Sequence, residues 1–246
     1  MNVAVIGKGL IGGSLEKAAL RAKHNAEIFR GRAQLPDLNR FDFVFLAVPP
    51  SAVEGKVREI AASGTLREGA VVMDISGVKG SVCQALADFE NTKGWTFIGA
   101  HPMAGKEKLG YENSCENLFD GASMILTPFE STGKAIVEST SEFLKTLGFS
   151  RVVVTDPADH DEMIAYTSQL CHLISYRCRR AAEKSVLHNV YRANRLTALN
   201  VCFNYRLEYR FLSLAEFLVK HFTALSSPLP IKLKAKKALK NNFISF

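Results

Sequence analysis

Short apolar runs alternate with longer segments of helical periodicity over the first two thirds of the chain. The short runs are rich in valine, isoleucine, phenylalanine and alanine, which is typical of strands buried on both faces of a sheet. The longer segments repeat their apolar residues every three or four positions, as an amphipathic helix does. The predicted strands are residues 2–6, 26–29, 41–48, 70–75, 96–99, 123–126 and 151–154. The predicted helices are residues 11–23, 52–62, 78–89 and 133–147.

Strands that alternate with crossover helices predict an α/β fold with a parallel, doubly wound sheet. Residues 1–155 are therefore expected to form an N-terminal Rossmann domain. The connection between the second and third predicted strands is short, so the helix that usually lies there is expected to be missing.

The strand pattern stops after Asp156-Pro157. Residues 158–184 and 205–222 have the pattern of long helices, so residues 156–246 are predicted to form an all-helical second domain. The residues after about 225 contain Pro228, Pro230 and a lysine cluster, and they are predicted to pack poorly.

The composition is that of an ordinary globular protein, since 47% of the 246 residues are hydrophobic and 22% are charged. No apolar run approaches the ~20 residues that cross a bilayer, so no membrane contact is expected. The chain enters a strand directly after Met1, without the basic segment of a signal peptide. The five cysteines are scattered and none forms a CxxC pair. This favours free thiols in a reducing cytoplasm and predicts no metal site.

Charge is distributed unevenly along the chain. Residues 1–170 contain 17 Lys+Arg and 21 Asp+Glu, a net charge of −4, whereas residues 171–246 contain 14 and 3, a net charge of +11. Three explanations stay open: a basic binding surface, a site for an anionic substrate, or a sequence altered by truncation or frameshift. A nucleic-acid partner is not expected, because no motif that reads nucleic acid accompanies the basic residues.

A glycine-rich motif, Gly7-Lys8-Gly9-Leu10-Ile11-Gly12, lies between the first predicted strand and the first predicted helix. In this position the GxGxxG pattern is typical of dinucleotide binding. Gly7 permits a tight turn, Gly9 lets a pyrophosphate approach the backbone, and Gly12 lets the helix pack on the strand. The free N–H groups of the first helical turn, at Leu10 and Ile11, are expected to bind the phosphates.

The end of the second strand bears on the choice of cofactor. NAD enzymes usually place an acidic residue there, about 20 residues after the glycine motif, to hold the ribose hydroxyls. Residues 28–32 contain no acid, but they contain Arg30 and Arg32. Because arginine suits the 2′-phosphate of NADP, we slightly favour NADP over NAD. The alternative is that both arginines are solvated surface residues.

Three further segments follow predicted strands, at the edge where open α/β sheets bind ligands. They are Ala47-Val48-Pro49-Pro50, Asp74–Gly80 and Gly99–Glu107. Together with the glycine motif, with Asp156–Asp161 and with Ser168–His172, these segments resemble the prephenate dehydrogenase family. The resemblance extends from residue 1 to about residue 176, and the His-Pro-Met-Ala-Gly sequence from His101 is its most specific part. Val48 and Pro49 are expected to contact the cofactor.

The resemblance implies a Rossmann domain followed by a helical domain that pairs into a homodimer. It also implies the oxidative decarboxylation of prephenate to 4-hydroxyphenylpyruvate in tyrosine biosynthesis, or the same reaction of arogenate, its amino analogue. Hydride leaves C4 of the ring for the nicotinamide, a base takes the hydroxyl proton, and CO2 departs as the ring becomes aromatic. His101 matches the family's base, and a free imidazole, with a pKa of about 6.5, is mostly neutral in the cytoplasm.

The resemblance directs further residues to the substrate. Lys79 either offers it a positive charge or orders the catalytic loop, with an exposed lysine as the alternative. Glu107 matches an acid at the mouth of the site, although a solvated loop residue fits the sequence as well. Ser168 and His172 lie one turn apart on one helix face, and the family directs this pair to the substrate. The alternative for His172 is a place in the core.

Two positions depart from the family's pattern. The family often has a serine at the position of Gly77, where it bonds the substrate hydroxyl and the catalytic histidine, and the neighbouring Ser76 is the candidate for that contact. With a one-residue gap, Arg195 aligns with the arginine that binds a substrate carboxylate. If the divergent C-terminal half forms no substrate site, the alternative is a dinucleotide-binding protein without catalysis, although the intact His101 argues against it.

Overall fold

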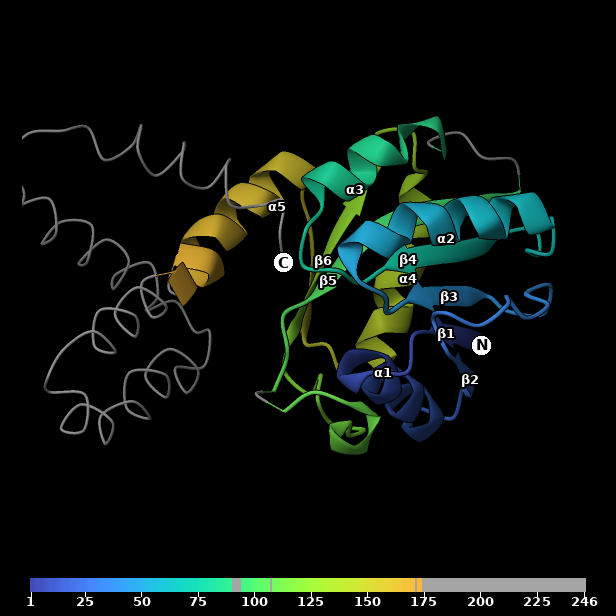
Figure 1. Cartoon of the computed structure of the whole chain (residues 1–246), viewed down its shortest axis with the longest axis horizontal. Helices are drawn as coiled ribbons and strands as arrows, with labels where there is room; N and C mark the ends of the chain where they lie inside the picture. Colours follow the sequence, from blue (N-terminus) through green and yellow to red (C-terminus); the bar gives the residue numbers. More distant parts are fainter. Residues whose placement is uncertain (90–93, 107, 171, 174–246) are drawn as a thin grey trace, which may run out of the picture. The chain divides into compact units, whose positions relative to one another are not determined.

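The computed structural model describes residues 1–89, 94–106, 108–170 and 172–173 (Figure 1). The chain divides into two units, Met1–Glu162 and Met163–Phe246. The sheet and its covering helices belong to the first unit. The predicted tail after residue 225 and the predicted helix 205–222 lie outside the described residues.

One seven-stranded sheet organises the first unit, in the order β2-β1-β3-β4-β5-β6-β7. Neighbouring strands are parallel except for β5 and β6, which are antiparallel, so the prediction of a wholly parallel sheet was wrong at this pair. The physical reason is that the described residues between these two strands contain no α-helix to carry the chain across the sheet. The strands are β1 Asn2–Ile6, β2 Asn25–Phe29, β3 Phe43–Leu46, β4 Ala70–Asp74, β5 Trp95–Pro102, β6 Ser123–Pro128 and β7 Arg151–Val154.

The predicted helices of the first unit are present, with shifted ends. The third is the most shortened, because it stops at Ala85 and continues only as a 3-10 turn, Ala87–Phe89. Residues 30–42, between β2 and β3, contain no helix, which confirms the expectation that the usual helix is missing there. The helices are α1 Leu10–Arg21, α2 Pro50–Ser63, α3 Gly80–Ala85, α4 Lys134–Thr146 and α5 Pro157–Ile164.

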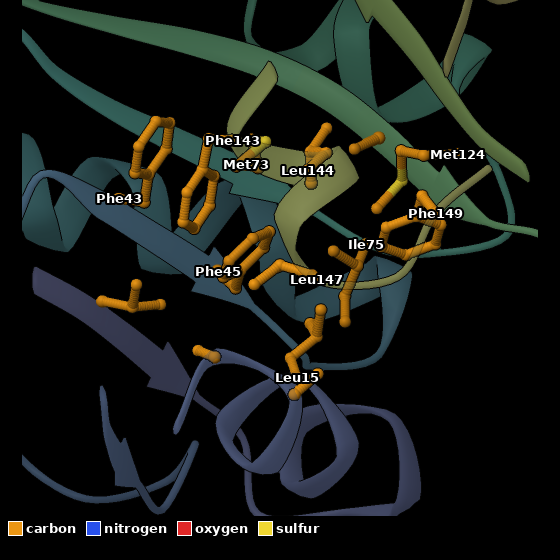
Figure 2. Packing of buried hydrophobic residues seen from close by; sticks show 14 of the residues in the cluster. Leu15, Phe43, Phe45, Met73, Ile75, Met124, Phe143, Leu144, Leu147 and Phe149 are labelled. Atoms are coloured by element: carbon orange, nitrogen blue, oxygen red, sulfur yellow. The ribbon is translucent and has the colours of Figure 1, made fainter. Parts of the chain in front are cut away.

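Each central strand is buried on both faces, and successive residues point to opposite helical layers. Phe43 and Phe45 pack with α1 and α4 on one face, whereas Val44 and Leu46 pack with α2 and α3 on the other. Figure 2 shows the first layer, in which Phe143 of α4 lies beside Phe43 and Phe45. The apolar runs of the sequence therefore have the two-sided burial that their lack of alternation predicts.

The start of α5 is fixed by local chemistry. The Asp156 carboxylate accepts hydrogen bonds from the amides of Ala158 and Asp159, at 2.8 and 2.9 Å, and Pro157 is the first helical residue. Both features are typical of a helix N-terminus. The predicted continuous helix 158–184 is interrupted by a π-helical turn, Ala165–Gln169, and its part after residue 173 lies outside the described residues. Within the described ranges, no helix is long and apolar enough to span a bilayer.

We predict that Phe143→Ala destabilises the first unit by about 3–5 kcal/mol, because it opens a cavity at the centre of the aromatic layer. The Phe143 ring stacks on that of Phe43, with centroids 3.9 Å apart and planes inclined by 6°. The control, Phe143→Leu, keeps most of the apolar volume and should cost less than about 1.5 kcal/mol. Urea denaturation measures both free energies of unfolding. An alanine variant that unfolds at the native urea midpoint would contradict this packing.

Candidate active site

The glycine motif forms the turn between β1 and α1, and two of its glycines are required by close backbone contacts. Gly7 has a φ of +126°, and a Cβ there would lie 2.0 Å from the carbonyl oxygen of Ala47. A Cβ at Gly12 would lie 2.0 Å from the carbonyl oxygen of Gly7. These two glycines therefore serve the packing of turn, strand and helix.

Gly9 differs from the other two, because a Cβ there would meet no atom within 4 Å. No contact among the described residues requires a glycine at this position. A ligand that approaches the backbone at Gly9 explains it. Because Gly9 also lies at the N-terminus of α1, this space fits the pyrophosphate of a dinucleotide.

The N-terminus of α1 is electrostatically suited to the same ligand. Its N-cap residue, Gly9, makes no side-chain capping bond, and its first turn contains no acidic residue. The amides of this turn, which include those of Leu10 and Ile11, therefore keep their partial positive charge for an anion. The residues present thus fit a bound dinucleotide.

The end of β2 lies beside the glycine motif. The amide of Gly7 donates to the carbonyl oxygen of Phe29 at 2.8 Å. A Cβ at Gly31 would lie 2.9 Å from Val48 Cγ1 and 3.7 Å from Gly7 Cα, so residue 31 contacts both the motif and the end of β3. Pro49 follows as the N-cap of α2.

Arg30 and Arg32 flank Gly31, and both are exposed. No ion pair joins either arginine to another residue within the described ranges. The structure thus brings these arginines and Val48-Pro49 to the same edge as the glycine motif.

The segment between β5 and β6 packs against the start of α1. The Tyr111 hydroxyl donates to Glu16 at 2.8 Å, and the Cys115 amide donates to the Ser14 hydroxyl at 3.2 Å. The ammonium of Lys8 lies 4.5 Å from the centre of the Tyr111 ring. This segment follows His101 in the chain, so it connects the end of β5 to the glycine motif.

Lys79 is fully buried, and its ammonium is hydrogen-bonded to other groups of the protein. Its Nζ lies 2.5 Å from each carboxylate oxygen of Asp74, and it donates to the carbonyl oxygen of Ala100 at 2.8 Å. Burial lowers the pKa of Lys79 from its ordinary value, although the Asp74 carboxylate acts in the opposite direction. Of the two predicted roles, the ordering of the loop agrees with these contacts, and the alternative of an exposed lysine was wrong.

Ser76 belongs to the same buried cluster. Its hydroxyl lies 2.6 Å from Asp74 Oδ2, to which it donates, and 3.4 Å from Lys79 Nζ. Gly77 is the residue that lies beside His101, since a Cβ there would be 3.6 Å from His101 Nε2. A contact between Ser76 and the substrate stays a prediction, and the hydroxyl is directed to Asp74.

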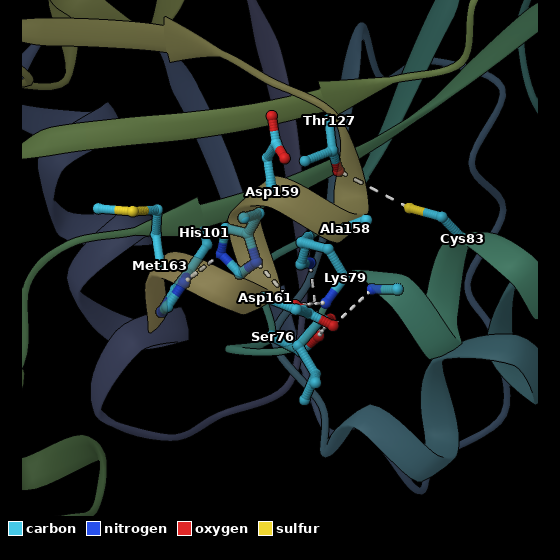
Figure 3. Close-up of polar contacts among 12 residues, drawn as sticks. Ser76, Lys79, Cys83, His101, Thr127, Ala158, Asp159, Asp161 and Met163 are labelled. Carbon is cyan, nitrogen blue, oxygen red and sulfur yellow. Dashed lines mark hydrogen bonds and ion pairs between the residues drawn. The ribbon is translucent and has the colours of Figure 1, made fainter. Parts of the chain in front are cut away.

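His101 lies inside β5, which extends past the predicted strand end at Gly99, and it pairs with Ile125 of β6. Its ring is half-buried, and its Nδ1 lies 2.9 Å from Nε2 of His160 (Figure 3). Burial lowers the pKa of His101 to about 4, with smaller contributions from His160 and Lys79. The imidazole is therefore neutral at pH 7 and able to accept a proton.

His160 and Asp161, which follow the N-cap of α5, were assigned no role from the sequence. His160 is 2% exposed, and its Nδ1 lies 2.8 Å from Asp161 Oδ1. Asp161 also accepts the amides of Lys79 and Gly80, at 2.8 and 2.9 Å. Burial raises the pKa of Asp161, but the bond to His160 and the two amides outweigh it and lower the pKa overall. The signal available in the sequence was the His-Asp pair one turn after a helix start.

The remaining predicted site residues fall in other parts of the chain. Glu107 and Arg195 lie outside the described residues. His172 is exposed, and its Nδ1 lies 2.8 Å from the carbonyl oxygen of Ser168, so these two residues share one helix face as predicted. Both belong to the second unit. Their relation to the substrate stays a prediction.

Comparison with known proteins gives consistent matches. A family model described as "Prephenate dehydrogenase, nucleotide-binding domain" matches residues 5–154. Cyclohexadienyl dehydrogenase of Zymomonas mobilis is 28% identical over 196 residues, which cover 72% of this chain and 65% of the relative. Prephenate dehydrogenase of Bacillus subtilis is 27% identical over 194 residues, which cover 71% of this chain and 52% of the relative. The match thus spans between half and two thirds of these relatives.

Solved structures share the fold. Synechocystis arogenate dehydrogenase has a TM-score of 0.63 at 23% identity, covering 98% of this chain and 88% of the neighbour. Prephenate dehydrogenase of Aquifex aeolicus, in complex with hydroxyphenyl propionate and NAD+, has a TM-score of 0.63 at 22% identity, covering 97% and 98%.

The difference between the glycines yields a prediction. Gly9→Ala should keep the native melting temperature, because its Cβ meets nothing, but it should weaken dinucleotide binding at least about tenfold, or ~1.4 kcal/mol. Gly12→Ala should lower the melting temperature, because its Cβ collides with the Gly7 carbonyl. Thermal denaturation and calorimetric titration with NAD and NADP separate the two effects. Unchanged dinucleotide affinity in Gly9→Ala would rule out a pyrophosphate site at Gly9.

Proposed function

We propose that this chain, which belongs to the prephenate dehydrogenase family, oxidises prephenate with loss of CO2 and transfers hydride to a nicotinamide dinucleotide. The observation that carries the proposal is a half-buried His101, whose pKa is lowered by burial, at the carboxyl ends of the strands that also hold the glycine motif. The strands β1, β3, β4 and β5 are parallel neighbours, so their carboxyl ends meet at that edge.

The chain's own groups account for binding and proton transfer in this reaction. Gly7, Gly9 and Gly12, with the amides of Leu10 and Ile11, would hold the pyrophosphate of the dinucleotide. Its nicotinamide would supply the hydride acceptor. His101 accepts the proton of the substrate hydroxyl at Nε2, where Gly77 leaves room for the reacting group.

The substrate has two candidates within the family. Prephenate and arogenate differ in a keto or an amino group on the side chain. Glu107, Ser168, His172 and Arg195 are proposed to bind the substrate, and the helical domains are proposed to pair into a homodimer. A turnover assay that crosses prephenate and arogenate with NAD and NADP tests the proposal. No turnover in any combination would favour a dinucleotide-binding protein without catalysis.

Replacement of the proposed base should remove catalysis and leave the cofactor site intact. We expect His101→Asn to lower kcat by about 10²–10⁴, the usual contribution of general acid–base catalysis, with little change in dinucleotide affinity. His24→Asn is the matched control. His24 precedes β2, at the amino end of the strand, and its ring is hydrogen-bonded to the hydroxyl of Thr146. Near-native kcat in His101→Asn would exclude His101 as the base.

The lowered pKa of His101 predicts an unusual pH dependence. Protonated His101 accepts no proton, so kcat/KM should fall as the pH falls through about 4, whereas an ordinary imidazole gives a limb near 6.5. The free energy of unfolding should also decrease as the pH falls. Between pH 6.5 and 4 the unfolded chain holds more of this proton than the folded chain, so the folded state loses stability as the pH falls. An acid limb near 6.5 in the kcat/KM profile would contradict the buried, neutral imidazole.

The preference for NADP rests on Arg30 and Arg32. If they bind the 2′-phosphate, Arg30→Ala combined with Arg32→Ala should weaken NADP binding much more than NAD binding. Arg40→Ala is the control, since Arg40 is exposed but paired with Glu27. Calorimetric titration measures the four affinities. Equal weakening of both cofactors, or none, would make the arginines ordinary surface residues, and tighter native binding of NAD would remove the preference for NADP.

A further inference from the structure

A chain of hydrogen bonds leads away from His101 on the side opposite the substrate position. It runs from His101 Nδ1 to His160 Nε2 at 2.9 Å, and from His160 Nδ1 to Asp161 Oδ1 at 2.8 Å (Figure 3). We infer that His160 and Asp161 are positioning residues, which hold His101 in the tautomer with a proton on Nδ1 and a free lone pair on Nε2. This inference rests on the proposed role of His101 as the base.

The direction of the hydrogen bonds begins at Asp161. An ionised carboxylate only accepts hydrogen bonds, and Asp161 accepts two from the amides of Lys79 and Gly80. Those amides stabilise the ionised form at the start of α3. The bond between Asp161 and His160 therefore requires the proton to be on His160 Nδ1.

The tautomer of His101 follows from that of His160. A neutral imidazole has one donor and one acceptor nitrogen, so His160 with a proton on Nδ1 presents a lone pair at Nε2. The bond of 2.9 Å then requires His101 to donate from Nδ1. His101 Nε2 is left without a proton, which is the form that a base needs.

A doubly protonated His160 would reverse this direction. It would donate from Nε2 to His101 Nδ1 and leave His101 with its proton on Nε2, where it accepts nothing. His160 is 2% exposed, and the ¹⁵N measurement described below distinguishes the two directions. The charged groups nearest to the network are Asp161, already shared with two amides, and Lys79, which is paired with Asp74.

The free lone pair is on the nitrogen that lies beside Gly77. Gly77 lies beside His101 Nε2, and even a Cβ on that residue would be 3.6 Å away. The reacting hydroxyl of a substrate can therefore approach Nε2 without displacing a side chain of residue 77. The other ring nitrogen, Nδ1, is hydrogen-bonded to His160, so Nε2 is the nitrogen that can interact with the substrate.

The same chain stabilises His101 after it has reacted. The O–H bond of the substrate breaks, an N–H bond forms at Nε2, and one positive charge appears on the ring. The Nδ1 proton already lies in a hydrogen bond to His160, and Asp161 supplies the compensating negative charge beyond it. This compensation opposes the burial that disfavours a charged His101. The logic is that of a base oriented by a second ring and a carboxylate.

The experiment replaces the middle residue in two ways in the full chain. His160→Leu removes the acceptor for His101 Nδ1, so kcat should fall about 10- to 100-fold, the usual cost of losing an orienting partner, with dinucleotide affinity unchanged. His160→Gln offers a carboxamide oxygen to His101 Nδ1 and should recover most of that loss. His24→Gln and His24→Leu are the matched controls, and neither should alter kcat. Native kcat in a folded His160→Leu variant, or no difference between the two His160 variants, would overturn the inference.

A second measurement does not depend on turnover. In the native chain with ¹⁵N-labelled histidine, NMR should find the His101 proton on Nδ1, with the His101 signals assigned by their loss in His101→Asn. In His160→Leu the proton should redistribute towards Nε2. A native His101 with its proton on Nε2 would overturn the inference even if the enzyme is active. If no substrate turns over but the proton is on Nδ1, the proposed function fails while the tautomer assignment stands.

Discussion

The buried ion pair between Lys79 and Asp74 is the interaction on which the candidate active site depends. Its two partners lie at the end of β4 and at the start of α3, and the Lys79 ammonium also binds the carbonyl of Ala100 in β5. The backbone amide of the same lysine binds Asp161. One residue thus fixes the two strand ends and the carboxylate that orients His160. Because removal of one partner would leave an uncompensated buried charge, at a cost of about 3–5 kcal/mol, the pair has little freedom to change.

The candidate active site has two parts, the glycine motif and the hydrogen-bonded network at His101, and they differ in construction. The half proposed to bind the dinucleotide depends on the absence of side chains, since Gly7 and Gly12 permit close packing and Gly9 leaves open space. The proposed proton-transfer half depends on hydrogen-bonded polar side chains, His101 from β5 with His160 and Asp161 from α5. A hydride acceptor needs a surface that admits a large planar ligand, whereas a base needs one fixed orientation. The difference in construction agrees with the two proposed functions, dinucleotide binding and proton transfer.

The errors of prediction have physical causes that can be traced to particular residues. The apolar run at 123–126 gave the position of β6 but not its direction, because apolar strands of either direction have the same composition. Lys79 was open to interpretation as a solvent-exposed lysine, since nothing in its neighbours in sequence shows that Asp74 and Ala100 surround it. The missing helix between β2 and β3 was predicted correctly, because chain length alone limits what fits between two strands.

The sequence by itself determined the positions of strands and helices, the glycine motif, and the histidine that serves as the candidate base. These features depend on local periodicity, on backbone freedom and on short motifs, all of which lie within a few neighbouring residues. Only the tertiary structure decided what His101 contacts. Its partner His160 is 59 residues away in the chain, and Asp161 is 82 residues from the Lys79 amide that it accepts. Hydrogen bonds over such separations exist only after the sheet has brought the strand ends and α5 together, so no local pattern encodes the tautomer of the candidate base.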